Sequence, residues 1–176
     1  MKNVKPGFII ETRRLVLREL EAGDAGELSK VLSDAESMRH YPHPFSNAEV
    51  KAWIEKNIKR YSDFGFGLWA VIRKEDGVFL GDCGITMQNI DGEMLPEIGF
   101  HIILKYCKNG YATEAARACL DYALKKLKYN SVYSYTRASN VASQCVAVKI
   151  GMKEKKRYEK DGFEHVVYEY IKDAYI

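Results

Sequence analysis

Apolar residues follow two different periods along the chain, and this predicts a mixture of strands and helices. Seven short segments are apolar or alternate apolar with polar residues, which is typical of strands. These segments are residues 13–20, 67–74, 78–87, 96–104, 130–137 and two runs within 153–171. Asp91-Gly92 and Asp161-Gly162 are pairs that favour tight hairpin turns, so each should join two antiparallel strands.

Four helices are predicted from capping residues and from apolar residues that recur every three or four positions. Two of them begin with the spacing of a capping box, at Asp24–Glu27 and at Ser46–Glu49. Helical spacing also covers residues 115–127, and a fourth helix should run from Asn140 to Gly151.

The order of these elements predicts the architecture. Three consecutive strands precede a helix and a further strand, so the strands 96–104 and 130–137 should be parallel neighbours. We therefore expect an α+β (mixed α/β) fold, with four helices on a mixed, mostly antiparallel sheet of about seven strands. At 176 residues, the whole chain (1–176) is expected to form a single domain.

Composition and charge argue against several classes of function. Apolar residues make up 47% of the chain and charged residues 29%, which is ordinary for a globular protein. A net charge of +3 is too small to indicate a nucleic-acid partner, and no nucleic-acid-binding motif is present. Residues 1–15 lack the apolar run of a signal peptide or membrane span, so we expect a cytoplasmic protein without a membrane partner.

The cysteines and histidines show no pattern of metal ligands. The four cysteines are far apart and include no CxxC pair, so we expect reduced and mostly buried thiols. They are Cys83, Cys107, Cys119 and Cys145. His40 and His43 would need a third ligand to hold a metal ion, and the sequence indicates none.

The segment "KYCKNGYATEA", Lys105 to Ala115, joins a strand to a helix and has the features of an anion site. A helix N-terminus offers unpaired backbone N–H groups and a partial positive charge. Gly110 permits a sharp turn, and Lys105 and Lys108 add positive charge. Consecutive backbone amides come from Asn109, Gly110, Tyr111, Ala112 and Thr113. No P-loop or dinucleotide motif is present, and an ordinary turn with solvated lysines is the alternative interpretation.

Four stretches carry a resemblance to a known family: "ETRRLVLREL", "PEIGFHI", "NGYATEAA" and "NVASQCVAVKIGM". Through them the chain resembles the GCN5-related N-acetyltransferase (GNAT) superfamily from Arg13 to Tyr170. Within that superfamily it is most similar to the RimJ/RimL type, which acetylates the N-termini of ribosomal proteins. The resemblance implies acetyl-CoA or CoA as cosubstrate, bound where the two parallel strands splay apart.

The resemblance also implies which residues hold the cosubstrate. In this superfamily the strand–helix loop follows an Arg/Gln-x-x-Gly-x-Gly/Ala pattern and binds the pyrophosphate of coenzyme A. Lys105 stands at the Arg/Gln position, Lys108 replaces the first glycine and Gly110 matches the last, so we expect weaker or redirected binding. The pantetheine arm would pair with the strand edge at Ile102, Ile103 and Leu104. A backbone amide of Ile102 or Ile103 would meet the oxyanion.

In this superfamily an amine attacks the thioester directly, so no protein nucleophile is implied. Glu97 occupies a strand position where several members carry a general base, and His101 is a second candidate because its ordinary pKa suits proton transfer near neutrality. Ser143 would donate to the leaving thiolate, since Ala147 stands where many members have a tyrosine. Asn140 would hold the pantetheine arm or the substrate. Simple structural roles remain open for all four polar residues, including helix capping by Asn140 and Ser143.

The acceptor is left open by the sequence. A protein N-terminal α-amine follows from the RimJ/RimL resemblance, and a small amine or amino sugar is the alternative enzyme substrate. A non-catalytic CoA-binding module with the same fold is a third reading, supported by Lys108 and Ala147. The sequence likewise leaves open whether the protein is a monomer or a homodimer.

Overall fold

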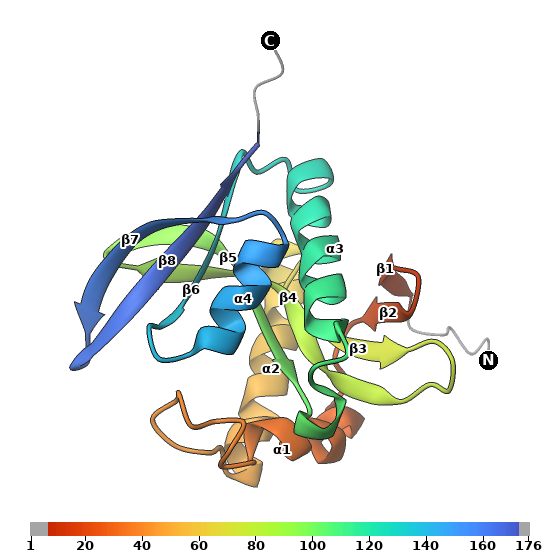
Figure 1. Ribbon diagram of the computed structural model, residues 1–176. Coiled ribbons are helices and arrows are strands. Elements are labelled where there is room, and N and C mark those ends of the chain that lie inside the picture. The colour runs from red at the N-terminus through yellow and green to blue at the C-terminus, as the bar shows by residue number, and fades with distance from the viewer. Residues whose placement is uncertain (1–6, 173–176) are drawn as a thin grey trace.

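An eight-stranded sheet runs through the protein and carries four α-helices (Figure 1). The computed structural model describes residues 7–172. The strands are β1 (Phe8–Glu11), β2 (Leu15–Arg18), β3 (Leu68–Arg73), β4 (Phe79–Ile90), β5 (Glu93–Ile102), β6 (Ser131–Arg137), β7 (Lys153–Lys160) and β8 (Phe163–Ile171). The helices are α1 (Ala25–Leu32), α2 (Asn47–Phe64), α3 (Tyr111–Lys125) and α4 (Val141–Lys149), with short 3₁₀ turns η1 (Ala22–Asp24) and η2 (Leu104–Tyr106).

The strand order across the sheet is β1-β2-β3-β4-β5-β6-β8-β7. Within residues 7–172, β5 and β6 form the one parallel pair, and the other neighbouring strands are antiparallel. The predicted mixed sheet, its parallel pair and the four helices are therefore confirmed. Pairing between β5 and β6 is limited to Glu97 opposite Tyr133, so these two strands separate within a few residues.

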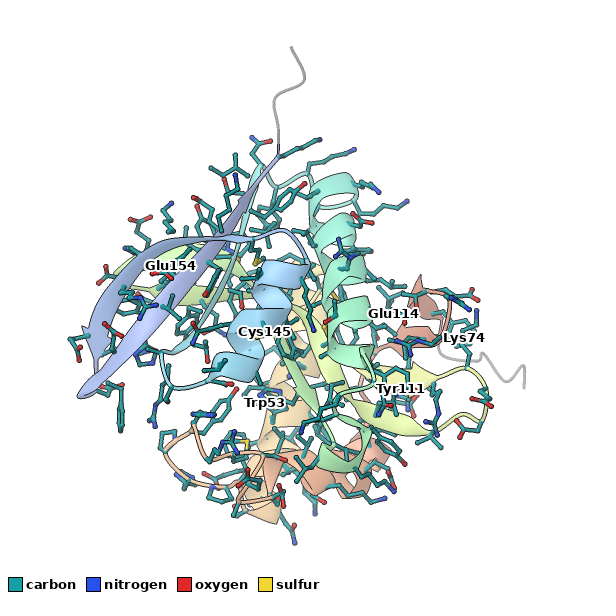
Figure 2. All side chains as sticks on the ribbon, in the orientation of Figure 1. Trp53, Lys74, Tyr111, Glu114, Cys145 and Glu154 are labelled. Carbon is teal, nitrogen blue, oxygen red and sulfur yellow. The ribbon has the colours of Figure 1, made fainter. Side chains whose placement is uncertain are left out.

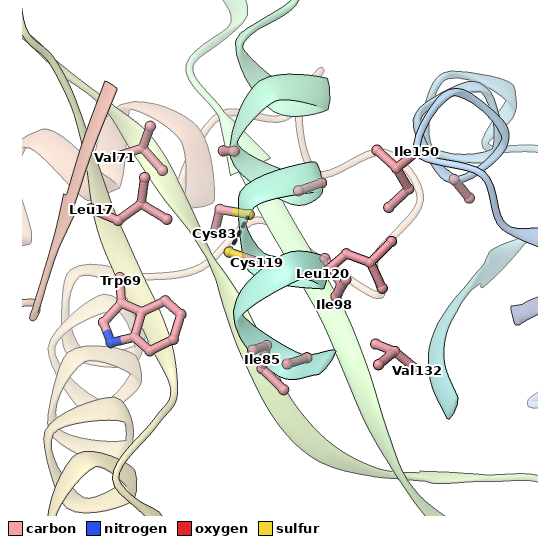
Figure 3. Packing of buried hydrophobic residues seen from close by; sticks show 14 of the residues in the cluster. Leu17, Trp69, Val71, Cys83, Ile85, Ile98, Cys119, Leu120, Val132 and Ile150 are labelled. Atoms are coloured by element: carbon pink, nitrogen blue, oxygen red, sulfur yellow. Dashed lines mark hydrogen bonds between the residues drawn. The ribbon is translucent and has the colours of Figure 1, made fainter. Parts of the chain in front are cut away.

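Helices cover both faces of the sheet (Figure 1). α3 and α4 contact each other on one face, and α1 and α2 contact each other on the opposite face. The core beneath α3 is shown in Figure 3, where Val71 and Leu17 lie on one side of the helix and Ile150 on the other. Small buried residues such as Ala116 and Cys119 let α3 lie close to the sheet, so its N-terminus is held rigidly beside β5.

Two features of the N-terminal third differ from the sequence prediction. β1 was not predicted, because it is a four-residue edge strand whose side chains are exposed or only partly buried. The predicted Asp24–Glu27 capping box is wrong. The Asp24 carboxylate instead accepts from the backbone amide of Glu21 at 2.8 Å and forms two bonds of 2.8 Å with Arg18, so η1 precedes α1.

The remaining local predictions are confirmed. Ser46 Oγ accepts from the Glu49 amide at 3.2 Å, and Glu49 Oε2 accepts from the Ser46 amide at 2.8 Å. Asp91-Gly92 turns between β4 and β5 with positive φ at both residues, and Asp161-Gly162 does the same between β7 and β8. Of the helices in the part of the chain described, none is both long and apolar enough to cross a membrane.

We expect Ser46→Ala to destabilise the protein by about 1 kcal/mol, because it leaves an amide at the start of α2 without its side-chain acceptor. Urea unfolding would measure the change. Ser62→Ala is the matched control, since Ser62 is exposed in the last turns of the same helix and alanine is the better helix former there. Equal effects of the two substitutions would contradict the capping role.

Candidate active site

A cleft of about 610 Å³ lies where β5 and β6 separate. Its walls come from β5, the η2–α3 junction, β6, α4 and the loop between α1 and α2. The structure brings together most of the predicted site residues here. Those lining the cleft are Glu97, His101, Ile102, Leu104, Lys108, Gly110, Tyr111, Ala112, Thr113, Asn140 and Ser143. Ile103, Lys105 and Asn109 do not line it.

The η2–α3 junction presents a row of free backbone amides. Within residues 7–172, none of the six N–H groups from Lys108 to Thr113 has a protein acceptor, and the first amide of this helix to be bonded is that of Glu114, which donates to the Gly110 carbonyl at 3.0 Å. Lys108 and Gly110 both have positive φ, of 63° and 79°. These two left-handed residues curl the chain so that successive amides turn toward one side, which is the geometry of an anion-binding nest.

The turn between β1 and β2 holds this junction in place. Arg14 donates from Nε to Glu114 Oε2 at 2.6 Å, and from Nη1 to the Asn109 carbonyl at 3.0 Å. Thr12 Oγ1 adds a bond of 2.7 Å to Glu114 Oε1. Figure 2 shows Glu114 and Tyr111 on the end of α3 that faces β1 and β2. The first turn of α3 is thus anchored by charged hydrogen bonds to residues 100 and 102 positions away in the sequence.

Glu97 is a buried carboxyl that faces the cleft. Burial raises its pKa from the ordinary 4.5 to about 7, although His101, the Thr86 hydroxyl, Arg60 and the Tyr135 amide all act in the opposite direction. A carboxyl with this pKa is partly ionised at neutral pH. It is therefore suited to take a proton from an amine and to release it again.

His101 is held on both sides by hydrogen bonds. Its Nδ1 lies 2.7 Å from Asp82 Oδ1, and its Nε2 lies 2.7 Å from the Tyr41 hydroxyl. Asp82 is fully buried, and its second oxygen accepts from Trp53 Nε1 at 2.9 Å. Burial lowers the pKa of His101, but the charge of Asp82, its hydrogen bond and the charge of Glu97 outweigh this, and the net pKa is raised.

The two backbone amides expected to meet an oxyanion are placed differently. The Ile103 amide donates to the Leu80 carbonyl at 2.8 Å, so that part of the prediction is wrong. Bonding directions alternate along a strand, so the Ile102 amide points away from β4 and toward the gap beside β6. Of the two, Ile102 alone has an amide directed to the cleft.

On the α4 side, Asn140 caps the helix and Ser143 lines the cleft. The Asn140 side-chain oxygen accepts from the Ser143 amide at 3.2 Å, which leaves its NH₂ group and the Ser143 hydroxyl without a partner in residues 7–172. Ala147 is buried at 2% exposure and takes no part in the cleft. Ser143 is therefore the hydroxyl of α4 that can reach a group bound there.

The comparisons with known proteins agree with this geometry. The acetyltransferase (GNAT) domain family matches residues 14–153. This chain belongs to the GNAT acetyltransferase family. It is 35% identical to the uncharacterized protein YkkB of Bacillus subtilis over 90% of this chain and 92% of that one. It is also 30% identical to the uncharacterized N-acetyltransferase YnaD of the same organism, over 86% of each chain.

Solved structures show the same fold. A GNAT-family acetyltransferase from Bacillus anthracis superposes with a TM-score of 0.79 at 26% identity, covering 92% of this chain and 97% of that one. RimL, a ribosomal-protein α-N-acetyltransferase in complex with coenzyme A, superposes with a TM-score of 0.74 at 16% identity, covering 96% and 99%. The GNAT fold predicted from the sequence is confirmed, and the protein is an acetyltransferase.

In this GNAT acetyltransferase, Lys108 stands where the family pattern has glycine and still adopts the glycine-like conformation, with φ of 63°. Left-handed φ is unfavourable for a lysine, but the Asn109 carbonyl bond to Arg14 fixes the turn from outside. The replacement therefore keeps the curl of the loop and adds a side-chain charge at the cleft.

Some features of the acetyltransferase site were missed or mispredicted. Asp82 and Tyr41 were not expected to bond to His101. The available signal in the sequence was a lone carboxylate within the apolar run "VFLGDCGITM".

Cys107 and Cys145 are exposed and both line the cleft, so the expectation that they are buried is wrong. Cys107 lies in the η2–α3 junction, and Cys145 lies on α4 (Figure 2). The other two cysteines are buried, with their sulfur atoms 3.7 Å apart.

We expect the stability of this acetyltransferase to fall as pH rises from about 4.5 to about 7, in part because of Glu97. A carboxyl with a raised pKa in the folded state stabilises it fully below the unfolded pKa, near 4.5, and loses that contribution as pH rises through about 7. Since each pH unit corresponds to about 1.4 kcal/mol, the loss is about 3 kcal/mol. Glu97→Gln should abolish this part of the pH dependence in urea unfolding between pH 5 and 8.

Glu93→Gln is the matched control for that experiment, because Glu93 is exposed at the start of the same strand. It should leave the pH dependence unchanged. A wild-type slope that persists in Glu97→Gln would mean that Glu97 is ionised normally in the folded protein.

Proposed function

We propose that this protein is an acetyl-CoA-dependent N-acetyltransferase that acts on a primary amine. The observation that carries the proposal is the row of free amides from Lys108 to Thr113 at the mouth of the cleft. These donors, at the N-terminus of a 15-residue helix, suit an anion such as a diphosphate group. The RimL fold, which binds coenzyme A, supports the assignment.

In this proposal the amides of the junction hold the pyrophosphate, with Lys108 adding charge. The pantetheine arm would lie along β5 and pair with the free edge near Ile102, much as an added strand would. Asn140 and Ser143 would contact the arm from α4. The thioester would then lie in the gap between β5 and β6, within the part of the cleft lined by Glu97.

The chemistry follows from the groups around that gap. Glu97 accepts a proton from the substrate ammonium, and the neutral amine attacks the thioester carbonyl, forming the C–N bond. The Ile102 amide donates to the oxyanion of the tetrahedral intermediate. Collapse of the tetrahedral intermediate breaks the C–S bond, and the Ser143 hydroxyl donates a hydrogen bond to the departing thiolate. The thiolate then takes the second proton of the attacking nitrogen and becomes the thiol of CoA.

An N-terminal α-amine is the acceptor that the electrostatics favour. Its pKa is about 8, within about one unit of the value for Glu97, whereas that of a lysine side chain is about 10.4. Proton transfer to Glu97 is therefore much less costly from an α-ammonium. RimL, which shares this fold, is a ribosomal-protein α-N-acetyltransferase, and this likeness supports such a substrate.

A small amine is the second candidate acceptor, and one observation favours it. The loop between α1 and α2 bridges the acceptor side of the cleft: His40 Nδ1 lies 3.1 Å from Ser139 Oγ, and Tyr41 reaches His101. A bridged opening admits a small molecule more easily than the terminus of a folded protein. Comparing kcat/KM for a serine-initiated peptide and for glucosamine would decide between the two.

We expect Thr113→Asp to weaken CoA binding at least tenfold. Thr113 lies in the first turn of α3 and lines the cleft, so a carboxylate there would repel a diphosphate. The same carboxylate is favourable at a helix N-terminus, so the fold should be unharmed. Isothermal titration calorimetry with CoA would measure the change.

Thr113→Asn is the matched control for this substitution, because it has the same shape without the charge. It should bind CoA within about threefold of wild type. If wild type does not bind CoA, or if the Asp and Asn variants bind it equally well, the junction is not the pyrophosphate site.

We expect Glu97→Gln to lower kcat/KM for the amine by about 10²-fold or more at pH 7, because the amide cannot accept the proton. Ser143→Ala should lower kcat by a smaller factor, about tenfold, and Glu97→Gln should leave the affinity for CoA unchanged. Steady-state assays of thiol release, with calorimetry for CoA, would test both. An unchanged rate in Glu97→Gln would exclude this residue as the base.

A further inference from the structure

The tautomer of His101 is set by a fully buried carboxylate. Asp82 accepts hydrogen bonds only, so its bond of 2.7 Å to Nδ1 requires that this nitrogen carries the proton. Asp82 cannot turn away, because its other oxygen is held by Trp53 Nε1 at 2.9 Å and its side chain has no exposure to water. The neutral imidazole therefore has Nε2 as its acceptor atom.

Tyr41 is the group that this acceptor atom faces. Its hydroxyl lies 2.7 Å from Nε2, and the ring, carried by the loop between α1 and α2, is packed at 5.5 Å between centroids from the imidazole. When His101 is neutral, the Tyr41 hydroxyl donates its proton to Nε2, and its oxygen then has only lone pairs to offer to other groups. Tyr41 lines the same cleft as Glu97, so a molecule bound in the cleft can lie beside both side chains.

We propose that Tyr41 binds the substrate amine: its hydroxyl oxygen, oriented by Asp82 and His101, accepts one N–H of the ammonium group beside Glu97. This rests on the proposed function. A primary ammonium has three N–H donors, and a site that fixes its direction needs more than one acceptor. Glu97 takes the proton that leaves, and Tyr41 holds a second N–H, so that the nitrogen is fixed relative to the thioester. Asp82 and His101 are positioning residues in this arrangement.

The arrangement selects a substrate whose reacting group donates hydrogen bonds. A thioether in place of the amine has no proton to donate and would lose the bond to Tyr41, and a hydroxyl would donate a single, uncharged hydrogen bond. A hydrogen bond from a charged donor is among the stronger ones in proteins, and its loss corresponds to about a tenfold or greater change in affinity. Asp82 on β4 and Tyr41 on the loop between α1 and α2 are hydrogen-bonded to the imidazole of His101. Glu97 on β5 acts on it through its charge, and Trp53 on α2 holds Asp82.

The test separates binding of the amine from binding of the cosubstrate. A serine-initiated hexapeptide, glucosamine and methylamine are assayed with wild type, and the amine with the highest kcat/KM is used for the variants. Tyr41→Phe should raise KM for that amine at least tenfold and leave KM for acetyl-CoA unchanged. Tyr170→Phe is the control for loss of a tyrosine hydroxyl, since Tyr170 lies on β8 and does not line the cleft. Thermal unfolding should show both variants folded, as Tyr41 is partly exposed.

A spectroscopic measurement tests the positioning role without turnover. Long-range ¹H–¹⁵N NMR of wild type should show His101 protonated at Nδ1 when neutral, and Tyr41→Phe should shift its Nε2 resonance because the donor is lost. Methylammonium, titrated in the presence of CoA, should perturb the same Nε2 resonance in wild type and not in Tyr41→Phe.

The outcomes distinguish this inference from the proposed function. If CoA does not bind or no amine is acetylated, the proposed function fails and the inference fails with it. If amines are acetylated and Tyr41→Phe has the same amine KM as wild type, the proposed function stands and the role of Tyr41 is overturned. A rise in both Michaelis constants, or a neutral His101 protonated at Nε2, would overturn it as well.

Discussion

The separation of β5 from β6 is the constraint on which the rest of the site depends. Parallel pairing at Glu97 and Tyr133 holds the two strands together at one level. Beyond that level, the edges of β5 and β6 that face each other have backbone groups that do not pair with the opposite strand. The cleft lies in that gap, and α3 begins at its mouth because it is the crossover between the two strands. The same gap leaves Glu97 lining the cleft although it is buried, and burial raises its pKa.

A second constraint is the rigid placement of the N-terminus of α3. Ala115, Ala116 and Cys119 are fully buried and small, so the helix lies close on the sheet and cannot easily shift along it. Glu114 is then tied to Thr12 and Arg14, and Arg14 reaches the carbonyl of Asn109. The left-handed turn at Lys108 and Gly110 is fixed between these contacts, so its free amides need no rearrangement before they meet an anion.

The side of the cleft beside the loop between α1 and α2 is organised by the buried carboxylate of Asp82. Asp82 has no exposure to water, and a buried carboxylate is tolerated only when hydrogen bonds replace its hydration. His101 and Trp53 supply them, from β5 and α2, and Tyr41 extends the chain of bonds to the loop between α1 and α2. Elements on one face of the sheet and the edge of the cleft are thereby linked through a single polar network.

The sequence by itself determined most of the elements and most of the residues that line the α3 side of the cleft. Local signals sufficed there: the Ser46–Glu49 box, the Asp91-Gly92 turn, and the strand–turn–helix pattern from Ile102 to Thr113 each act over a few residues. Weak local signals failed, as at the short edge strand β1 and at Asp24, whose carboxylate is taken by Arg18. Only the tertiary structure decided that Asp82, His101 and Tyr41 meet, that Ile103 bonds to Leu80, and that Cys145 faces the cleft. Each of these depends on strand register or on which side of a helix faces a gap, and such relations join residues that are distant in the sequence and leave no local pattern.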